Sequence, residues 1–280
     1  MGRQPTQNPE PRTRHPFDFA QGRPAPGTRH LFLPPPRARQ RFRRTLLKWY
    51  RRNGRDLPWR RTRDPYRILV SEIMLQQTQV DRVRPKYEEW LRRYPTFEAL
   101  AAAPVDEVTR VWYPLGYNIR PKRLHAIARE AVATYGGALP DDEETLRSFK
   151  GIGAYTAGAV LSFAFGKRAP ILDTNVARVL FRVFVGRGNP RAHAMRRHLW
   201  DVSRTVLPTR DVFDFNQALM DLGATVCVAR SPRCPACPLA RQCRSYPYSL
   251  KQEEGSPQRD YESEPMQVCS LRSSNPTRRQ

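Results

Sequence analysis

The sequence predicts an all-α fold. Apolar residues recur at intervals of three and four through most of the chain, as they do on one face of a helix. No stretch of useful length alternates apolar and polar residues in the way of a half-buried strand. Several periodic segments open with proline or with acidic residues, which favour the first turn of a helix.

The predicted helices follow one another from about residue 41 to residue 225. The first has Phe42, Leu46, Leu47 and Tyr50 at helical spacing. The others are marked by apolar faces after Pro104 and from Leu124 to Val132, and by acidic residues in the first turn after Pro140. Further periodic runs lie at about 154–165, 174–185, 193–206 and 214–225.

The two ends differ in composition from this middle part. Residues 1–40 hold nine of the 27 prolines, seven arginines and two acidic residues, which predicts a disordered, basic Pro/Arg-rich tail. Residues 244–280 are rich in Ser, Pro, Gln and Glu, which predicts a disordered polar tail. The folded part is then 41–243, where 36 basic and 19 acidic residues give a net charge of +17.

The charge of the chain favours a polyanionic partner. The 49 basic and 26 acidic residues give a net charge of +23, which indicates nucleic acid first and an anionic membrane surface second. No apolar run approaches the roughly 18 residues of a membrane-spanning helix. We therefore expect no membrane association and, if the source is prokaryotic, a cytoplasmic, nucleoid-associated location.

Four of the five cysteines form a compact cluster: Cys227, Cys234, Cys237 and Cys243. Five cysteines are too few for a disulfide scaffold in a chain of this length, whereas four clustered thiolates can hold zinc or a [4Fe–4S] cluster. Zinc ribbons usually pair two CxxC motifs, but this segment has one CxxC flanked by single cysteines. Cys269 lies in the predicted tail with no partner in view.

A glycine-containing turn joins two of the predicted helices. Gly151 and Gly153 permit positive φ or a close backbone approach, and the free N–H groups of the next helix can face an anion. Lys150 precedes the glycines and suits a phosphate contact. An ordinary helix end followed by a tight turn would have the same sequence pattern.

The cysteine spacing and this turn resemble those of the helix-hairpin-helix DNA glycosylases of the endonuclease III and MutY type. In that superfamily the four cysteines hold a [4Fe–4S] cluster and the hairpin binds a DNA phosphate. The resemblance implies a monomer with a two-lobed glycosylase domain over 41–226. One lobe would span about 70–165, the other would join 41–69 to 166–226, and 227–243 would form the cluster loop.

Further segments closely resemble the adenine DNA glycosylase family, in the family's order: 57–61, 64–80, 115–117 and 215–224. The resemblance covers roughly 41–243, about three-quarters of the chain. It implies a DNA N-glycosylase of base excision repair. Such an enzyme hydrolyses the N-glycosidic bond of adenine mispaired with guanine or 8-oxoguanine in double-stranded DNA.

Two carboxylates are the first candidate catalytic residues. Glu72 lies in an apolar helical stretch, where burial would raise its pKa and retain a proton near neutral pH. The resemblance implies that Glu72 protonates N7 of adenine and that Asp173 stabilises the oxocarbenium-like transition state. Each has a structural alternative, because acids favour the first turn of a helix and Asp is a common N-cap.

The resemblance assigns further residues to the site. Tyr155 stands where strand-cleaving relatives carry a Schiff-base lysine, which predicts a monofunctional enzyme, and Asn175 matches a residue near the catalytic aspartate. The other matches are Arg55, Leu57 and Arg60 in the base pocket, and Gln77, Leu115 and Tyr117 as wedges against the duplex. The alternative for Arg60 is a phosphate contact, and the less favoured alternative for Leu115 and Tyr117 is core packing.

The sequence departs from the family in three places. Only 37 polar residues follow Cys243, so we expect a short form without the C-terminal domain that recognises 8-oxoguanine. Thr174 replaces a glycine beside Asp173, and Asn118 replaces a second tyrosine after Tyr117. These differences bear on lesion preference and leave base excision as the expected activity.

Three alternatives remain open. A T·G mismatch thymine glycosylase also has the cluster and a tyrosine at the hairpin, although the Leu75-Gln-Gln-Thr78 stretch argues against it. An endonuclease III-like glycosylase/lyase is disfavoured by the missing lysine. A non-catalytic iron–sulfur DNA-binding module is disfavoured by the two retained carboxylates, Glu72 and Asp173.

Overall fold

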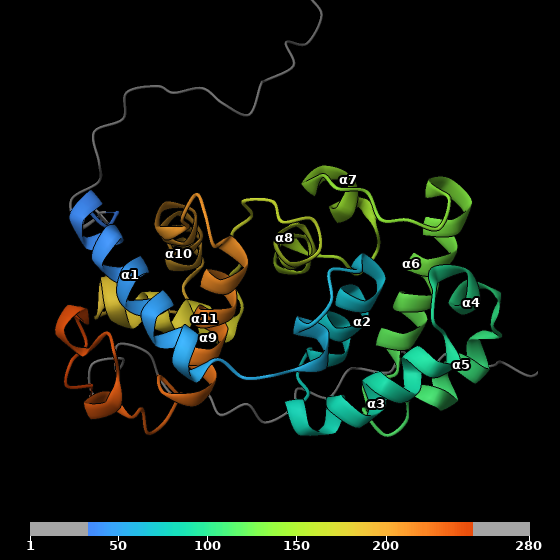
Figure 1. Ribbon diagram of the computed structural model, residues 1–280, viewed down its shortest axis with the longest axis horizontal. Coiled ribbons are helices and arrows are strands. Elements are labelled where there is room, and N and C mark those ends of the chain that lie inside the picture. Colours follow the sequence, from blue (N-terminus) through green and yellow to red (C-terminus); the bar gives the residue numbers. More distant parts are fainter. Residues whose placement is uncertain (1–32, 249–280) are drawn as a thin grey trace, which may run out of the picture. The chain divides into compact units, whose positions relative to one another are not determined.

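The computed structural model describes residues 33–248 (Figure 1). Over this range the chain is helical and has no β-strand, which confirms the all-α prediction. The elements are α1 (Pro36–Asn53), η1 (Pro58–Arg60), α2 (Pro65–Leu75), α3 (Val80–Arg93), α4 (Phe97–Ala102), α5 (Val105–Trp112), α6 (Ile119–Tyr135), α7 (Glu143–Ser148), α8 (Ala154–Phe163), α9 (Thr174–Leu180), the π-helical turn η2 (Phe181–Val185), α10 (His193–Val206), α11 (Val212–Thr225), η3 (Cys234–Ala236) and η4 (Ala240–Gln242).

The first helix begins earlier than predicted. Residues 36–40, placed in the N-terminal tail from their composition, form the first turn of α1. Pro36 fits there because the first helical position needs no N–H partner and proline has a helical φ. Phe42 and Leu46 are fully buried, so packing of this helix outweighs the local proline content. Residues 1–32 of the predicted tail lie outside the described residues.

The folded part also extends past Cys243. Ser245 is buried, and its backbone N–H donates to the Arg182 carbonyl at 3.1 Å. The Tyr248 ring lies 3.7 Å from the Arg182 guanidinium, in a cation–π contact. Residues 244–248 therefore pack on η2 and do not belong to a disordered tail as predicted. The rest of that tail, with Cys269, lies outside the described residues.

The helices pack in two sets around one apolar core. In one set α2 packs on α3 and α6, α5 packs on α6, and α4 lies along α6. In the other, α11 packs on α1 and α9, and α10 contacts α1 and α9. Helix α8 contacts both α2 and α11 and lies between the sets in Figure 1. Among the described helices, none is long and apolar enough to cross a membrane.

Candidate active site

A hollow of about 1060 Å³ gathers residues that are distant in the sequence. Its walls come from η1, the end of α2 and the loop after it, the start of α6, and parts of α8, α9 and α11. The predicted site residues that line it are Arg55, Leu57, Arg60, Glu72, Gln77, Tyr117, Tyr155, Asp173 and Asn175. Both candidate carboxylates therefore face one space.

Helix α2 places Glu72 in the wall of the hollow. Pro65 opens the helix, and the Asp64 side chain accepts hydrogen bonds from the backbone N–H groups of Tyr66 and Arg67. Since most of the following residues are buried, the helix is fixed by packing on both sides. The Glu72 side chain is buried as well, with 4 % of its surface exposed.

The environment of Glu72 favours its protonated form. Burial is the main cause that raises the pKa of Glu72, to about 7, against the opposing hydrogen bond from Tyr155. The charge of Asp173 adds to the rise, and the charge of Arg60 opposes it. The predicted rise in pKa is therefore confirmed. A carboxyl group with this pKa has a proton to donate near neutral pH.

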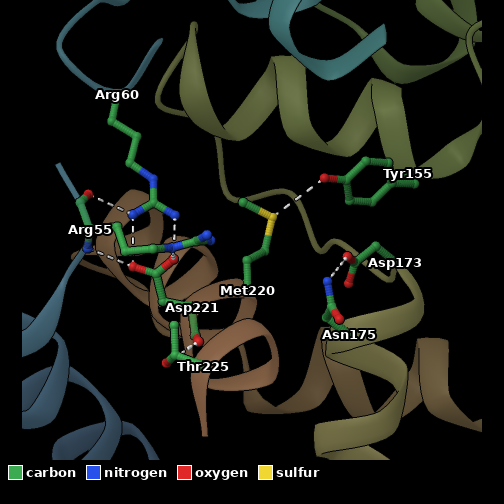
Figure 2. Close-up of polar contacts among 8 residues, drawn as sticks. All are labelled: Arg55, Arg60, Tyr155, Asp173, Asn175, Met220, Asp221 and Thr225. Atoms are coloured by element: carbon green, nitrogen blue, oxygen red, sulfur yellow. Dashed lines mark hydrogen bonds and ion pairs between the residues drawn. The ribbon is translucent and has the colours of Figure 1, made fainter. Parts of the chain in front are cut away.

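Tyr155 joins the carboxyl group to the opposite wall. Its hydroxyl donates to Glu72 Oε2 at 2.8 Å and lies 3.4 Å from Met220 Sδ, toward which it points in Figure 2. Burial, followed by the charges of Glu72 and Asp173, raises the pKa of Tyr155 well above its ordinary value. The phenol stays protonated and holds the orientation of the Glu72 carboxyl group.

Asp173 is the N-cap of α9, as its structural alternative predicts. Oδ1 accepts from the Val176 backbone N–H at 2.6 Å. Oδ2 accepts from Asn175 Nδ2 at 3.2 Å, as Figure 2 shows. Burial raises the pKa of Asp173 even though these hydrogen bonds favour its charged form. Thr174 is the first residue of α9, where a β-branched side chain is acceptable. The cap fixes a carboxylate that also faces the hollow.

Asp221 on α11 is a site residue that the sequence analysis missed. It is fully buried and binds two arginines: Oδ1 accepts from Arg55 Nε and Arg60 Nη2, both at 2.7 Å, and Oδ2 accepts from Arg60 Nη1 at 2.8 Å (Figure 2). Burial raises the pKa of Asp221, but the hydrogen bonds and charge of Arg60 outweigh it, so the pKa is lowered. An acidic residue inside an apolar helical run was the available signal.

This ion pair settles the position of Arg60. Its side chain is only 6 % exposed and makes a two-point contact with Asp221, so it is not the phosphate contact considered as an alternative. Arg55 is held by the same carboxylate through both its backbone N–H and its guanidinium. The two arginines therefore form a fixed wall of the hollow.

The predicted wedge residues divide into two kinds. Gln77 and Tyr117 are exposed at the hollow, and both have positive φ, 53° and 51°. Leu115 is 3 % exposed and packs in the core, which corrects its prediction as a wedge. The physical reason is that the turn buries its apolar side chain while its carbonyl accepts from the buried Arg120. Tyr117, two residues later, points outward with 59 % of its surface exposed.

The glycine-containing turn lies apart from the hollow, between α7 and α8. Gly151 has φ of 111°, whereas Gly153 is extended with φ of −91°, so only the first uses the glycine's conformational freedom. Gly153 is the N-cap of α8 and supplies no side chain to its first turn. Lys150 is exposed beside this turn. The arrangement leaves backbone N–H groups free to face an anion.

The four clustered cysteines line a second, small cavity of about 20 Å³. All four are free, and among residues 33–248 no group of three or more His, Cys, Asp or Glu is arranged to hold a metal ion. Arg182 Nη1 lies 3.7 Å from Cys227 Sγ, so one positive charge faces the cavity wall. Four thiols around one space, beside a buried guanidinium, fit a polynuclear group bound through four thiolates.

Comparison with known proteins gives a consistent family. The family model described as HhH-GPD superfamily base excision DNA repair protein matches residues 70–205. An adenine DNA glycosylase of Mycolicibacterium smegmatis is 49 % identical over 200 residues, covering 71 % of this chain and 67 % of the relative. An adenine DNA glycosylase of Rattus norvegicus is 43 % identical over 214 residues, covering 73 % of this chain.

A solved thermostable thymine-DNA glycosylase has a TM-score of 0.71 and 34 % identity, covering 76 % of this chain and 98 % of that structure. The chain spans 42 % of the length of the rat relative, so the match to that protein concerns less than half of it. The family model, over residues 70–205, includes Glu72, Tyr155 and Asp173.

Proposed function

The chain belongs to the HhH-GPD superfamily of base excision DNA repair proteins, and from this premise we propose that it is a monofunctional adenine DNA glycosylase. It hydrolyses the N-glycosidic bond of adenine mispaired with guanine or 8-oxoguanine. The observation that carries this proposal is the placement of a proton-holding Glu72 and a half-buried Asp173 in one hollow. Relatives named adenine DNA glycosylase support the choice of base.

Glu72 supplies the proton for the leaving group. Adenine leaves poorly as an anion, so protonation at N7 by the Glu72 carboxyl group lets the bond to the sugar break. A pKa of about 7 divides the group between the donor form and the ionised form near neutral pH. Tyr155 keeps the carboxyl group aimed by donating to Oε2, and Oε1 remains for the base.

Asp173 stabilises the positive charge that develops on the sugar, or traps it covalently. One of its oxygens is used by the cap of α9, and Asn175 orients the other. Tyr155 has no amine, so no Schiff base forms with the sugar and the DNA backbone stays intact. Leu57, Arg55 and Arg60 line the base pocket, and Gln77 and Tyr117 act as wedges against the base step.

The DNA-binding role rests on charge and on the hairpin. The predicted folded part has a net charge of +17, and Lys150, Gly151 and Gly153 meet a phosphate at the start of α8. Binding through phosphates is sensitive to salt. We propose a monomer, divided into the two lobes and cluster loop described above, acting in the cytoplasm near the nucleoid if the source is prokaryotic.

Cys227, Cys234, Cys237 and Cys243 hold a [4Fe–4S] cluster in this proposal. When bound, such a cluster cross-links the loop after α11 through four thiolates. The purified chain is expected to contain about four irons and four sulfides, and Cys237→Ser to lose most of this iron. Elemental analysis with Cys269→Ser as the matched control measures it. Stoichiometric zinc in freshly purified protein would contradict the assignment.

The function is tested by single-turnover assays on duplexes with A opposite 8-oxoguanine, A opposite G and T opposite G. The expected result is an abasic site in the adenine strand only, revealed as strand cleavage after hot alkali. A second candidate, thymine removal from T·G, is favoured by the structural similarity to the thymine-DNA glycosylase. Release of thymine, or strand cleavage without alkali, would replace the proposal with that activity or with a lyase.

A further inference from the structure

Arg120, on the first turn of α6, is a buried arginine outside the residues assigned so far. Only 4 % of its surface is exposed. Its guanidinium lies within hydrogen-bonding distance of five backbone carbonyl oxygens and one hydroxyl: those of Ile73, Met74, Gln76, Leu115 and Gly116, and Thr78 Oγ1. No acidic side chain is bonded to it among the described residues. The Arg120 guanidinium is thus bonded mainly to backbone carbonyls, and it holds the segments that carry them in fixed positions.

These acceptors belong to three separate pieces of the chain. Ile73 and Met74, at 3.1 and 3.0 Å from Nη1, are in the last turn of α2, the helix that bears Glu72. Gln76 and Thr78 belong to the loop after α2. The third piece is the turn between α5 and α6, whose carbonyls accept from Nη2 at 3.1 Å.

Each of the two loops contains one exposed residue in a strained conformation. Gln77 has φ of 53° and Tyr117 has φ of 51°, and they account for two of the three non-glycine residues with positive φ among residues 33–248. Such a conformation costs on the order of 1 kcal/mol at a non-glycine residue, so surrounding contacts must hold it. Arg120 donates to the Gln76 carbonyl before Gln77, to the Thr78 side-chain hydroxyl after it, and to the carbonyl of Gly116, the residue immediately before Tyr117.

The guanidinium also lies against aromatic rings. It is 5.1 Å from the centroid of the Tyr117 ring and 5.2 Å from that of Trp112. The Trp112 indole N–H donates to the Gly116 carbonyl at 2.9 Å, the same oxygen that Arg120 binds. The turn that presents Tyr117 is therefore fixed from two directions, and Arg120 is the group it shares with the Gln77 loop.

We propose that Arg120 is a positioning residue that couples the Gln77 loop to the Tyr117 turn, so that the two side chains distort the duplex as one unit. The inference rests on the proposed function and adds to it the means by which the two wedges act together. Arginine is needed because its planar fork reaches several carbonyls at once, whereas lysine offers one compact ammonium group. Arg120→Lys keeps the charge and loses this span.

The experiment measures base unstacking, which needs no excision. Duplexes carry 2-aminopurine beside the mismatched adenine, and its fluorescence rises when the base step opens. The variants Gln77→Ala, Tyr117→Ala and the double variant are compared in the Arg120 and the Arg120→Lys chains. In the chain with Arg120, the fold-loss of the unstacking signal in the double variant should be about tenfold smaller than the product of the fold-losses in the two single variants. In the Arg120→Lys chain the losses should simply multiply.

A second substrate and two further variants separate coupling from general damage. Excision of adenine placed opposite an abasic site, where unpairing is not required, should stay within about threefold of wild type in Arg120→Lys. Thr78→Val removes one acceptor without touching α2 and should weaken the coupling in part. Arg129→Lys, an exposed change on the same helix, is the matched control and should leave it unchanged.

Equal coupling in the Arg120 and Arg120→Lys chains would overturn the inference. An equal loss of excision on both substrates would also overturn it, because Arg120 would then act only through the fold around Glu72. Failure of the proposed function has a different appearance: the wild-type chain would release no adenine from either substrate, while its unstacking signal would still report on Arg120.

Discussion

Glu72→Gln is expected to lower the single-turnover rate of adenine excision by about a hundred- to ten-thousand-fold, the range of a lost general acid. Glutamine retains an oxygen that accepts the hydrogen bond from Tyr155, so the wall of the hollow is preserved. What it lacks is the proton. The affinity for A·8-oxoguanine duplex, measured by titration of labelled DNA, should change by less than about threefold, since the effect lies in the transition state.

Glu88→Gln, an exposed change of the same chemistry on α3, is the matched control and should keep the wild-type rate. Tyr155→Phe removes the hydrogen bond to Glu72 but leaves the acid in place, so its loss should be smaller than that of Glu72→Gln. Wild-type turnover in Glu72→Gln would end the assignment of this residue as the acid.

The pH dependence of kcat/KM provides an independent check on the same group. Because burial raises the pKa of Glu72 to about 7, its donor form is present below that pH and is lost as pH rises through it. Asp173 must be ionised, and its pKa is raised by burial, so activity is also lost on the acidic side. The profile should be bell-shaped, with its alkaline limb near pH 7. If activity instead falls only near pH 10, the assignment of Glu72 as the acid that controls the alkaline limb would be contradicted.

Asp221→Ala is expected to destabilise the protein by about 3–5 kcal/mol, the cost of leaving a buried arginine without its partner. Arg60 is 6 % exposed and has no other acidic partner among the described residues, so its charge would remain in the interior. The free energy of unfolding, from urea titration followed by circular dichroism, measures the effect. Excision should fall with it, because Arg55 and Arg60 line the hollow.

The contrast with an exposed ion pair makes this prediction specific. Asp201 pairs with Arg204 at 2.9 Å, but both side chains are more than half exposed. Asp201→Ala should therefore cost less than about 1 kcal/mol. If the two substitutions destabilise the protein equally, the ion pair of Asp221 does not have the energetic role that its burial indicates.

Most of the fold follows from patterns that are local in sequence. Helix α10 spans His193–Val206, the same residues that periodicity indicates, because one helical face is enough to define it. The first turn of α1 was missed because composition counts prolines without regard to position, and Pro36 occupies the one place where proline suits a helix. Composition similarly could not show that Ser245 is buried against η2.

A site residue could be predicted from the sequence when the residues that surround it in the structure are also its neighbours in the sequence. Glu72 is flanked by apolar residues of its own helix, so its raised pKa could be anticipated. Asp221 and Arg120 could not be assigned, because their partners are distant in the sequence. Arg60 and Arg55 lie 161 and 166 residues from Asp221, and Ile73 lies 47 residues from Arg120. Leu115 and Tyr117 were indistinguishable as wedges, since which one faces outward depends on where Arg120 holds the turn.

The ion pair between Arg60 and Asp221 also determines when, during translation, the hollow can be completed. Asp221 is made 161 residues after Arg60, so a chain still emerging from the ribosome has Glu72 long before it has this wall of the hollow. Met220, which faces Tyr155, arrives at the same late stage. A nascent or prematurely terminated chain that ends before α11 thus contains both carboxylates without an enclosed site. The wall that Arg60 and Asp221 form is therefore completed only after α11 has been made.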